Sequence, residues 1–269
     1  MEKQTFGLNR GVWCGKVVKG PEFNHDLRNK ETDEVIEQYF VVEVEVEFEN
    51  SKKTVKDTSV LPVLITKTKM DSLGGIQEGD LLFVKGEYRA YDRRDEESGR
   101  RHTITRILSK KTEKVEGYTR TRNKIEFHGV LKSKLYKAKF NEEGVLEKDE
   151  KGRPVAVLDE EGNKIPWVRR NTEGLTVNDF VLEVAKEIID ENGEVKTAYT
   201  DYIPMIAYGA VAWQIAKEIE LDTKVKARGY IRRRPKNGFD GEYVYEPVIT
   251  RITPVKEEEV KEEEIKDEE

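Results

Sequence analysis

Ile104-Thr105-Arg106-Ile107 occurs again as Ile249-Thr250-Arg251-Ile252, 145 positions further along this chain of 269 residues. A match of four residues carries little weight alone, so the flanking segments decide whether it marks a repeat. Four more pairs of segments match in the same order, and they are Val84–Arg89 with Ala227–Arg232, Leu61–Ile65 with Ile203–Ala207, Phe40–Val44 with Phe180–Val184, and Asn9–Gly15 with Asn123–Gly129. Five matching segments in one order indicate an internal duplication.

Both copies predict the same series of elements. Apolar and polar residues alternate over Phe40–Phe48, which is typical of a strand with one buried face. A glycine interrupts the fourth strand of each copy, at Gly86 and Gly229, as a sharply bent barrel strand requires. Good helix formers fill Ala210–Glu220, between the third and fourth strands. We therefore predict an all-β protein with a short helix per domain, built from two OB-fold five-stranded Greek-key barrels in tandem.

Composition suggests four segments along the chain. We expect a first OB-fold domain over 1–108, a basic linker over 109–122, a second OB-fold domain over 123–255 and a disordered acidic tail over 256–269. An insertion at 136–166 in the second domain contains turn-like stretches ending at Gly144, Gly152 and Gly162, which predict one or two hairpins. The formal net charge is −6, and the 3 Lys and 9 acidic residues of the tail account for all of it. Local patches of charge must therefore decide the partner.

Features of an enzyme, a secreted protein or a membrane protein are missing from the sequence pattern. The single cysteine, Cys14, excludes an internal disulfide framework and suits a reducing cytoplasm. No apolar run has the length of a signal peptide or a membrane span. His25, His102 and His128 lack metal-ligand spacing, and no phosphate-cradling Gly-Lys-Ser/Thr loop occurs. We predict no catalytic residue, no metal, no cofactor and no membrane partner, and a cytoplasmic, nucleoid-associated location.

Several segments of the second copy resemble bacterial and phage single-stranded DNA-binding proteins. Asn123–Leu131 resembles the first strand of that family. The segment Arg169–Gly174, which leads into Phe180–Val184, resembles sequences of the same family. Tyr199–Gly209 resembles the family's third strand and the start of its helix, and Val225–Arg234 resembles its fourth strand. The first copy matches the family through its duplication of the second copy, by the spacing of its segments rather than by residue identity. The resemblance implies DNA wrapped over the barrel, in support of DNA replication, recombination or repair, with bases stacked on rings and phosphates held by basic groups.

The resemblance also assigns residues by position. It places Tyr202 and Tyr208 where the family keeps stacking aromatics, and Arg232 and Arg234 on its basic fourth strand. The sequence departs from the family at two places where a tryptophan is common, and these hold Lys186–Ile189 after the second strand and Pro235-Lys236 after the fourth.

The residues themselves favour the same fourth strand. Alternation along a strand puts Arg228, Tyr230, Arg232 and Arg234 on one face, and such rings and guanidinium groups stack on bases and bridge phosphates without reading sequence. Rings also lie beside cations around Trp167 and from Tyr88 onward in the first copy. The predicted contacts of single-stranded DNA are Tyr202, Tyr208, Arg228, Tyr230, Arg232, Arg234, Trp167, Arg169, Arg170, Tyr88, Arg89, Tyr91 and Arg93.

Other interpretations of these residues stay open. The basic strand can be a solvated face of a charge-rich protein, and Tyr202 and Tyr208 can pack under a loop. Three glutamates from Glu43 to Glu47 are predicted on the outer face of the first barrel, where they would repel phosphate. We therefore expect the second barrel to bind more strongly. Trp213, in the predicted helix, is expected in the core.

The function predicted from the sequence is binding of single-stranded DNA with little sequence preference. A homodimer would present four barrels. The resemblance implies recruitment of replication and repair proteins through an apolar tip of the tail, but this chain ends Lys266-Asp267-Glu268-Glu269 without one. Two alternatives remain. One is an OB-fold RNA-binding protein, because stacking does not reject a ribose. The other is a protein–protein assembly module of a replication complex, favoured by the glutamate-rich strand and the acidic insertion.

Overall fold

The structure is a computed structural model of the chain and describes residues 7–49, 56–94, 101–118, 123–189, 194–236 and 242–255. The first half contains β1 (Leu8–Arg28), β2 (Val35–Glu49), β3 (Lys56–Thr66), α1 (Lys67–Ser72), β4 (Leu81–Arg94) and β5 (Arg101–Lys114). The second half contains β6 (Asn123–Ser133), β7 (Arg169–Arg170), β8 (Thr176–Ile189), β9 (Val195–Tyr208), α2 (Gly209–Lys217), β10 (Lys224–Pro235) and β11 (Tyr243–Pro254). Neither helix of the described residues is long and apolar enough to cross a membrane.

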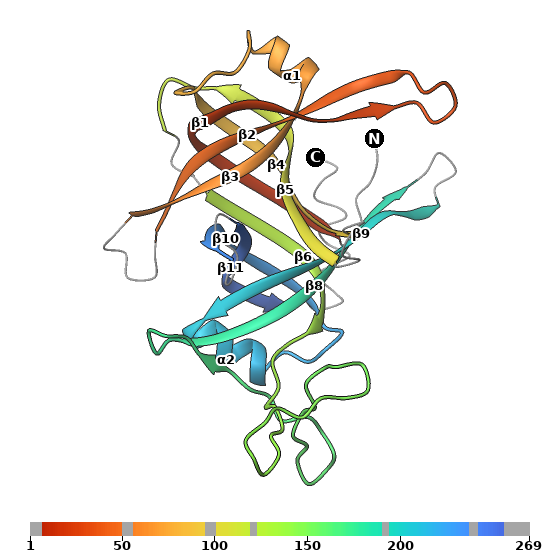
Figure 1. Cartoon of the computed structure of the whole chain (residues 1–269), viewed down its shortest axis with the longest axis vertical. Helices are drawn as coiled ribbons and strands as arrows, with labels where there is room; N and C mark the ends of the chain where they lie inside the picture. Colours follow the sequence, from red (N-terminus) through yellow and green to blue (C-terminus); the bar gives the residue numbers. More distant parts are fainter. Residues whose placement is uncertain are drawn as a thin grey trace.

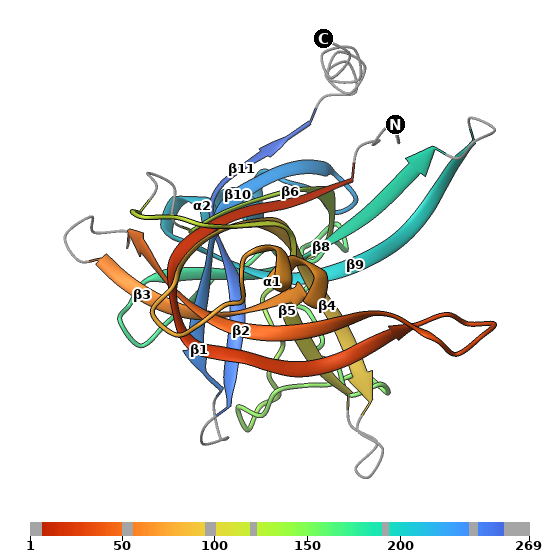
Figure 2. The same cartoon turned by 90° about the horizontal axis from the view of Figure 1, so that it is seen from above.

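Each half closes into a five-stranded ring (Figures 1 and 2). In the first ring β1 pairs with β2 and β4, β3 pairs with β2 and in parallel with β5, and β5 pairs with β4. β6, β8, β9, β11 and β10 repeat this ring strand for strand. A helix follows the third strand of each ring, which is the OB-fold order. The predicted fold class, two OB-fold barrels in tandem, is therefore confirmed.

Alternation along the strands fills the core. In β2 the side chains of Val42, Val44 and Val46 are fully buried, while the glutamates between them are only partly buried on the outer face. Burying each such valine stabilises the fold by about 1.5–3 kcal/mol. The predicted glutamate face of the first barrel is therefore present.

α2 corrects one prediction. Ile215 and Ile219 are buried against the second barrel, but Trp213 is 40% exposed and was expected in the core. Trp213 lies two positions from Ile215, and two positions turn a helix by about 200°, so its ring points away from the barrel. The ammonium of Lys217 lies 4.6 Å from the centroid of the Trp213 ring.

Both barrels use one asparagine to fasten the first strand to the fourth. Asn9 donates its side-chain amide to the carbonyl of Tyr88, and its side-chain oxygen accepts the Tyr88 backbone N–H at 2.9 Å. Asn123 makes the same two bonds to Ile231, at 2.8 and 3.0 Å. The repeated bond pattern is direct structural evidence for the duplication.

Glycine is required where the fourth strand crosses the fifth. A Cβ atom on Gly86 would lie 2.2 Å from the Leu108 carbonyl oxygen, and one on Gly229 would lie 1.9 Å from that of Val248. Both glycines adjoin a β-bulge in the pairing with the fifth strand. The predicted sharp bend of the barrel strand therefore depends on the missing side chain.

Strand pairing corrects the alignment of the two Ile-Thr-Arg-Ile stretches. Gly86 lies opposite Ser109, and Gly229 lies opposite Ile249, so Ser109 and Ile249 are equivalent and stand 140 positions apart. The match between the two Ile-Thr-Arg-Ile stretches implied an offset of 145 positions. The two tetrapeptides therefore occupy different places in their strands, five residues apart.

A smaller shift affects the second strands. A Cβ atom on Gly15 would meet the Glu45 carbonyl oxygen, and one on Gly129 would meet that of Glu183, so these glutamates are equivalent at an offset of 138 rather than 140. A shift of two leaves the buried face unchanged, because side chains alternate with a period of two.

The predicted linker is shorter than expected. β5 continues past residue 108 and ends at Lys114, which pairs with Leu82 of β4. The first six residues of the predicted linker are therefore strand, and their pairing with β4 continues past the bulge between Lys85 and Gly86. The predicted acidic tail, 256–269, and residues 119–122 lie outside the described residues.

The insertion forms three short hairpin-like loops, each flanked by an antiparallel bridge, where one or two hairpins were predicted, and the loops project away from the barrels (Figure 1). In each loop the side-chain oxygen of the first residue accepts backbone N–H groups two and four residues later, and the fourth residue is a glycine with positive φ. Each turn therefore closes on itself. The closing backbone hydrogen bonds join Asn141 to Val145, Asp149 to Arg153, and Asp159 to Asn163.

The two barrels share one continuous sheet, because β1 pairs antiparallel with β6 over Leu8–Trp13 and Asn123–His128 (Figure 1). Side chains reinforce this junction. The Tyr88 hydroxyl of the first barrel donates to the Tyr245 carbonyl of the second at 2.8 Å. The barrels therefore pack as one unit.

Gly229→Ala is expected to lower the free energy of unfolding by about 2–3 kcal/mol, because the added methyl group would overlap the Val248 carbonyl and force β10 away from β11. Gly20→Ala is the matched control, since nothing lies within 4 Å of a Cβ atom there. Urea unfolding measures both. Equal stabilities of the two variants would contradict the close approach of the strands.

Candidate nucleic-acid interface

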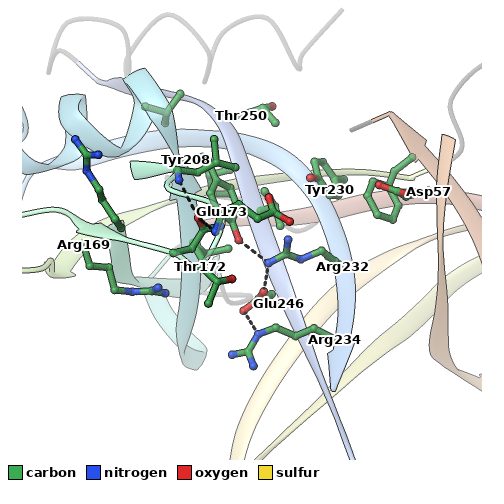
Figure 3. A pocket seen from close by; sticks show the side chains of 18 of the residues that line it. Asp57, Arg169, Thr172, Glu173, Tyr208, Tyr230, Arg232, Arg234, Glu246 and Thr250 are labelled. Carbon is green, nitrogen blue, oxygen red and sulfur yellow. Dashed lines mark hydrogen bonds and ion pairs between the residues drawn. The ribbon is translucent and has the colours of Figure 1, made fainter. Parts of the chain in front are cut away.

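A groove of about 1300 Å³ lies on the second barrel beside the first. β9, β10, β11 and the segment 169–175 supply most of its lining, and two residues of the first barrel complete it. We call it the aromatic groove (Figure 3), and its functional side chains are Phe48, Asp57, Arg169, Arg170, Tyr208, Tyr230, Arg232, Arg234 and Glu246.

Aromatic rings give the groove flat surfaces. Tyr230 stacks on Phe48 across the domain junction, with ring centroids 4.6 Å apart and 18° between the ring planes. Tyr208 precedes α2 in an extended conformation, and its half-buried ring lies in the groove (Figure 3). Rings of this kind can receive unpaired bases regardless of sequence, because every base has a flat face.

Glu246 holds two of the arginines (Figure 3). Arg232 donates from Nη2 to Glu246 Oε1 at 2.6 Å, and Arg234 donates from Nε to Oε2 at 3.0 Å. Arg232 also donates to the Tyr208 hydroxyl at 2.5 Å. Burial alone would lower the pKa of Arg232, but the contacts with Glu246 and Tyr208 outweigh it and raise the pKa. The arginine therefore stays charged and fixed in position.

The remaining arginines differ in their partners. Arg169 donates two hydrogen bonds to Asp179, at 2.6 and 2.9 Å. Arg170 is exposed and has no ion-pair partner among the described residues. The groove thus combines four arginines with three carboxylates in its lining, Asp57, Glu173 and Glu246.

A second cavity of about 840 Å³ extends the aromatic groove along the outer face of β8 and β9. The two cavities share Ile206, Arg234 and Glu246. Tyr202 lies further along the same face of β9, outside both linings, and is 58% exposed. A hydrogen bond to Glu183 raises the pKa of Tyr202.

Arg228 lies on a different surface, the outward side of β5, β4, β1, β6, β10 and β11, which we call the shared sheet face. At its centre Glu126 is 5% exposed. Its carboxylate accepts hydrogen bonds from Arg228 at 2.8 and 3.0 Å and from Arg10 at 3.0 Å. Burial alone would raise the pKa of Glu126, but these bonds outweigh it and lower the pKa to about 2.

Six of the predicted contact residues come together in the aromatic groove. Five others, whose side chains the structure describes, do not line it. Tyr202 and Trp167 are exposed outside it, and the Lys137 ammonium lies 5.9 Å from the Trp167 ring. For Tyr91 and Arg93 the backbone belongs to β4, but their side chains lie outside the described residues. The residues that meet in the groove are Tyr208, Tyr230, Arg169, Arg170, Arg232 and Arg234.

Tyr88 and Arg89 are corrections, because both lie inside the domain junction. The Tyr88 ring is 1% exposed, so it cannot stack on a base, and burial raises the pKa of its hydroxyl. Arg89 donates to Asp201 at 2.6 and 3.1 Å, and its guanidinium lies 3.6 Å from the centroid of the Tyr199 ring. These two residues hold the barrels together.

Sequence reasoning missed Phe48 and Glu246 as parts of the groove. Phe48 was expected only as a core residue of its own barrel, and its contact with Tyr230 depends on how the two barrels meet, which leaves no local pattern. Glu246 did leave a signal. It is the one carboxylate of β11 and the lone charge in the stretch Tyr243–Ile249, and a charge among apolar residues of a strand indicates a buried ion pair.

Comparison with known proteins supports the architecture. The structure is similar to the wild-type single-stranded DNA-binding protein from Thermus aquaticus, with a TM-score of 0.58, 14% sequence identity, and coverage of 93% of this chain and 94% of that chain. The chain has a tandem OB fold. A deletion mutant of the Thermus protein gives a TM-score of 0.59 at 14% identity over 93% of this chain and 96% of that chain. No protein-family model and no curated protein matches this tandem OB chain.

Within the described residues, no group of three or more His, Cys, Asp or Glu side chains is arranged to hold a metal ion. Cys14 is buried in β1, as expected for a small core residue.

The low pKa of Glu126 predicts a pH-dependent stability. The contribution is fully present above the unfolded pKa of about 4.3 and is lost as the pH falls through the folded pKa of about 2, a loss of about 3 kcal/mol at most. Glu126→Gln is expected to lower stability at pH 7 and to flatten its decline between pH 5 and pH 2. Urea unfolding at several pH values measures this.

Glu150→Gln is the control for that experiment, since Glu150 is exposed in the insertion. A decline as steep in Glu126→Gln as in the control would show that the Glu126 contacts contribute nothing to acid sensitivity.

Proposed function

We propose that this protein binds single-stranded DNA with little sequence preference, through the aromatic groove of its second barrel. One observation carries the proposal. The Tyr208 ring, the Tyr230–Phe48 stack and four arginines line one groove, and they come from elements far apart in the sequence. Rings that stack on bases and guanidinium groups that hold phosphates are the two components of sequence-tolerant binding. The likeness of the fold to the Thermus single-stranded DNA-binding protein agrees with this proposal.

The groove suits an unpaired strand better than a duplex. Stacking on Tyr208 requires a base with a free face, which a paired and stacked duplex does not offer. The ion pairs of Arg232 and Arg234 with Glu246 also limit the free positive charge in the groove. Duplex binding that depends on charge alone should therefore be weak.

Replacement of the Tyr208 ring tests the site. Tyr208→Ala is expected to weaken binding of oligo-dT about tenfold, because one stacked base contributes about 1–3 kcal/mol. Tyr208→Phe keeps the ring and should retain most of the affinity. Phe140→Ala is the matched control, since Phe140 is 58% exposed in the acidic insertion. Fluorescence anisotropy of labelled oligo-dT measures all three.

The same titration separates the rival functions. Labelled oligo-dT, oligo-rU and duplex DNA are compared at two salt concentrations. Preference for oligo-dT supports the proposal, and preference for oligo-rU would assign the groove to RNA. Failure to bind any of the three would leave protein–protein assembly as the function of the barrels.

Glu246→Gln is expected to tighten oligo-dT binding several-fold at low salt. The amide keeps the size of the side chain and can accept from one of the two arginines, but its NH2 group cannot accept from the other, and it no longer neutralises Arg232 and Arg234. The slope of log affinity against log salt should become steeper by about 1. Weaker binding by this variant would mean that Glu246 positions the arginines and that their net charge matters little.

Support of DNA replication, recombination or repair, a nucleoid-associated cytoplasmic location and assembly as a homodimer are parts of the same proposal. Sedimentation of the full chain with and without oligo-dT measures its oligomeric state.

A further inference from the structure

The aromatic groove contains two carboxylates that no cation neutralises. Of the three in its lining, Glu246 holds two arginines. Asp57 and Glu173 are exposed, and no arginine or lysine of the described chain pairs with either of them. Asp57 lies opposite Phe48, whose ring is already stacked on Tyr230. Glu173 is therefore the free carboxylate in the part of the groove where a ring can still receive a base.

Strand pairing places Glu173 close to Tyr208. Val177 of β8 lies opposite Tyr208 of β9 on one side and opposite Arg169 of β7 on the other. The turn 171–175 joins β7 to β8 directly beyond this row. Glu173 is the third residue of the turn, and its side chain lies in the groove (Figure 3). The turn therefore forms the wall of the groove beside the Tyr208 ring.

The turn that carries Glu173 is closed by its own hydrogen bonds. Asn171 Oδ1 accepts the backbone N–H group of Glu173 at 3.1 Å and that of Leu175 at 2.8 Å. The Asn171 N–H donates to the Leu175 carbonyl at 3.0 Å, and Gly174 has a positive φ of 77°. The backbone under Glu173 is thus fixed before a ligand binds, which lowers the entropy that a contact with its side chain must offset.

The same kind of turn occurs three times in the insertion, where the third residues are Glu143, Lys151 and Glu161. The turn therefore accepts a lysine at this position as well as a glutamate. A lysine close to Tyr208 would attract phosphate, whereas a free carboxylate repels it. Because the chain has a glutamate at this position of the groove, the position suits a contact with a part of the nucleotide other than its phosphate.

Tyr208 lies between this turn and Arg232. The order of strands in the sheet is β10, β11, β9, β8 and β7, so Arg232 of β10 and the turn after β7 lie on opposite sides of β9. Arg232 donates to the Tyr208 hydroxyl from its side. The hydrogen-bonding edge of a base points away from its sugar and phosphate. A nucleotide with its base on Tyr208 and its phosphate at Arg232 therefore presents that edge to the turn.

A carboxylate distinguishes bases by their amino groups. An ionised glutamate accepts hydrogen bonds and donates none. Cytosine, adenine and guanine each have an amino group that donates, whereas thymine has a carbonyl oxygen, O4, in the place of the cytosine amino group. An ionised Glu173 therefore attracts the edge of a base with an amino group and repels O4 of thymine.

We propose that Glu173 reads the base stacked on Tyr208 and gives the groove a preference for bases with an amino group over thymine. This rests on the proposed binding of single-stranded DNA in the groove. It adds one selective contact to binding that is otherwise tolerant of sequence, and it gives the free carboxylate a favourable contact that offsets its repulsion of phosphate.

The test compares oligo-dC with oligo-dT on the full chain, at about 8 nucleotides, a length that one OB fold holds. A homopolymer puts the same base on Tyr208 in every register. Glu173→Gln should lower the ratio of oligo-dC affinity to oligo-dT affinity about fivefold, because the amide can donate to thymine O4 as well as accept from cytosine. Fluorescence anisotropy measures both affinities, and their ratio cancels differences in stacking that the variant leaves unchanged.

Glu161→Gln is the matched control, since Glu161 is exposed at the same position of an equivalent turn in the insertion, and it should leave the ratio unchanged. Equal tightening of oligo-dC and oligo-dT by Glu173→Gln would overturn the proposal, because Glu173 would then act by repelling phosphate alone. Unchanged affinities for both would overturn it too. Failure of the groove itself is distinguishable, since Tyr208→Ala would then leave the binding of oligo-dT unaffected.

Discussion

The antiparallel pairing of β1 with β6 is the constraint on which the rest of the structure depends. It joins residues 8–13 to residues 123–128 and turns two barrels into one sheet. Because the sheet is continuous, the outer strands of each barrel have only one way to face the other barrel. Phe48 then meets Tyr230, and the first barrel supplies one wall of a groove that is otherwise built by the second. A chain with the same two barrels on a flexible linker would possess both rings and no shared groove.

Duplication produced two such junctions, and their chemistry has diverged. Tyr230 follows Gly229 as Glu87 follows Gly86, so the two residues are equivalent. The aromatic pair of Tyr230 with Phe48 is matched at the other junction by an ion pair of Glu87 with Lys186, at 3.2 Å, and by a hydrogen bond to Glu87 from the Tyr199 hydroxyl at 2.9 Å. One junction is thus closed by charge and the other presents rings. This physical difference, more than the glutamate face of β2, explains why the second barrel carries the groove.

The sequence predicts what is local and repeated, and it fails where contacts are distant. The alternation of buried and outer residues in β2 and the glycines at 86 and 229 predict barrel strands correctly. Burial of a side chain and the close approach of two backbones each constrain a single position, so both can be recognised in the sequence. The Ile-Thr-Arg-Ile match indicates the duplication and misplaces the fifth strands by five residues, since strand register is set by the pairing with the fourth strand and not by four matching letters. The rings and arginines of the groove are visible in the sequence. Glu246 stands out in the sequence of its strand, but nothing local shows that it binds Arg232 and Arg234. Tyr88 is surrounded by rings and cations in the sequence, as a site residue would be, but its side chain is buried.

Net charge is a poor guide to the partner of this chain, because its charges are separated in space. Outside the tail the formal charge is close to zero, yet cations gather on the shared sheet face and acidic side chains on the three loops of the insertion. Those loops project from the end of the molecule away from β1 (Figure 1). At an ionic strength of 0.1 M an exposed charge is screened over about 10 Å, so a charged group near the shared sheet face experiences the cations of that face and very little of the insertion. The same reasoning applies inside the groove, where Glu246 lies within hydrogen-bonding distance of both arginines and therefore governs them, whatever the sign of the whole protein.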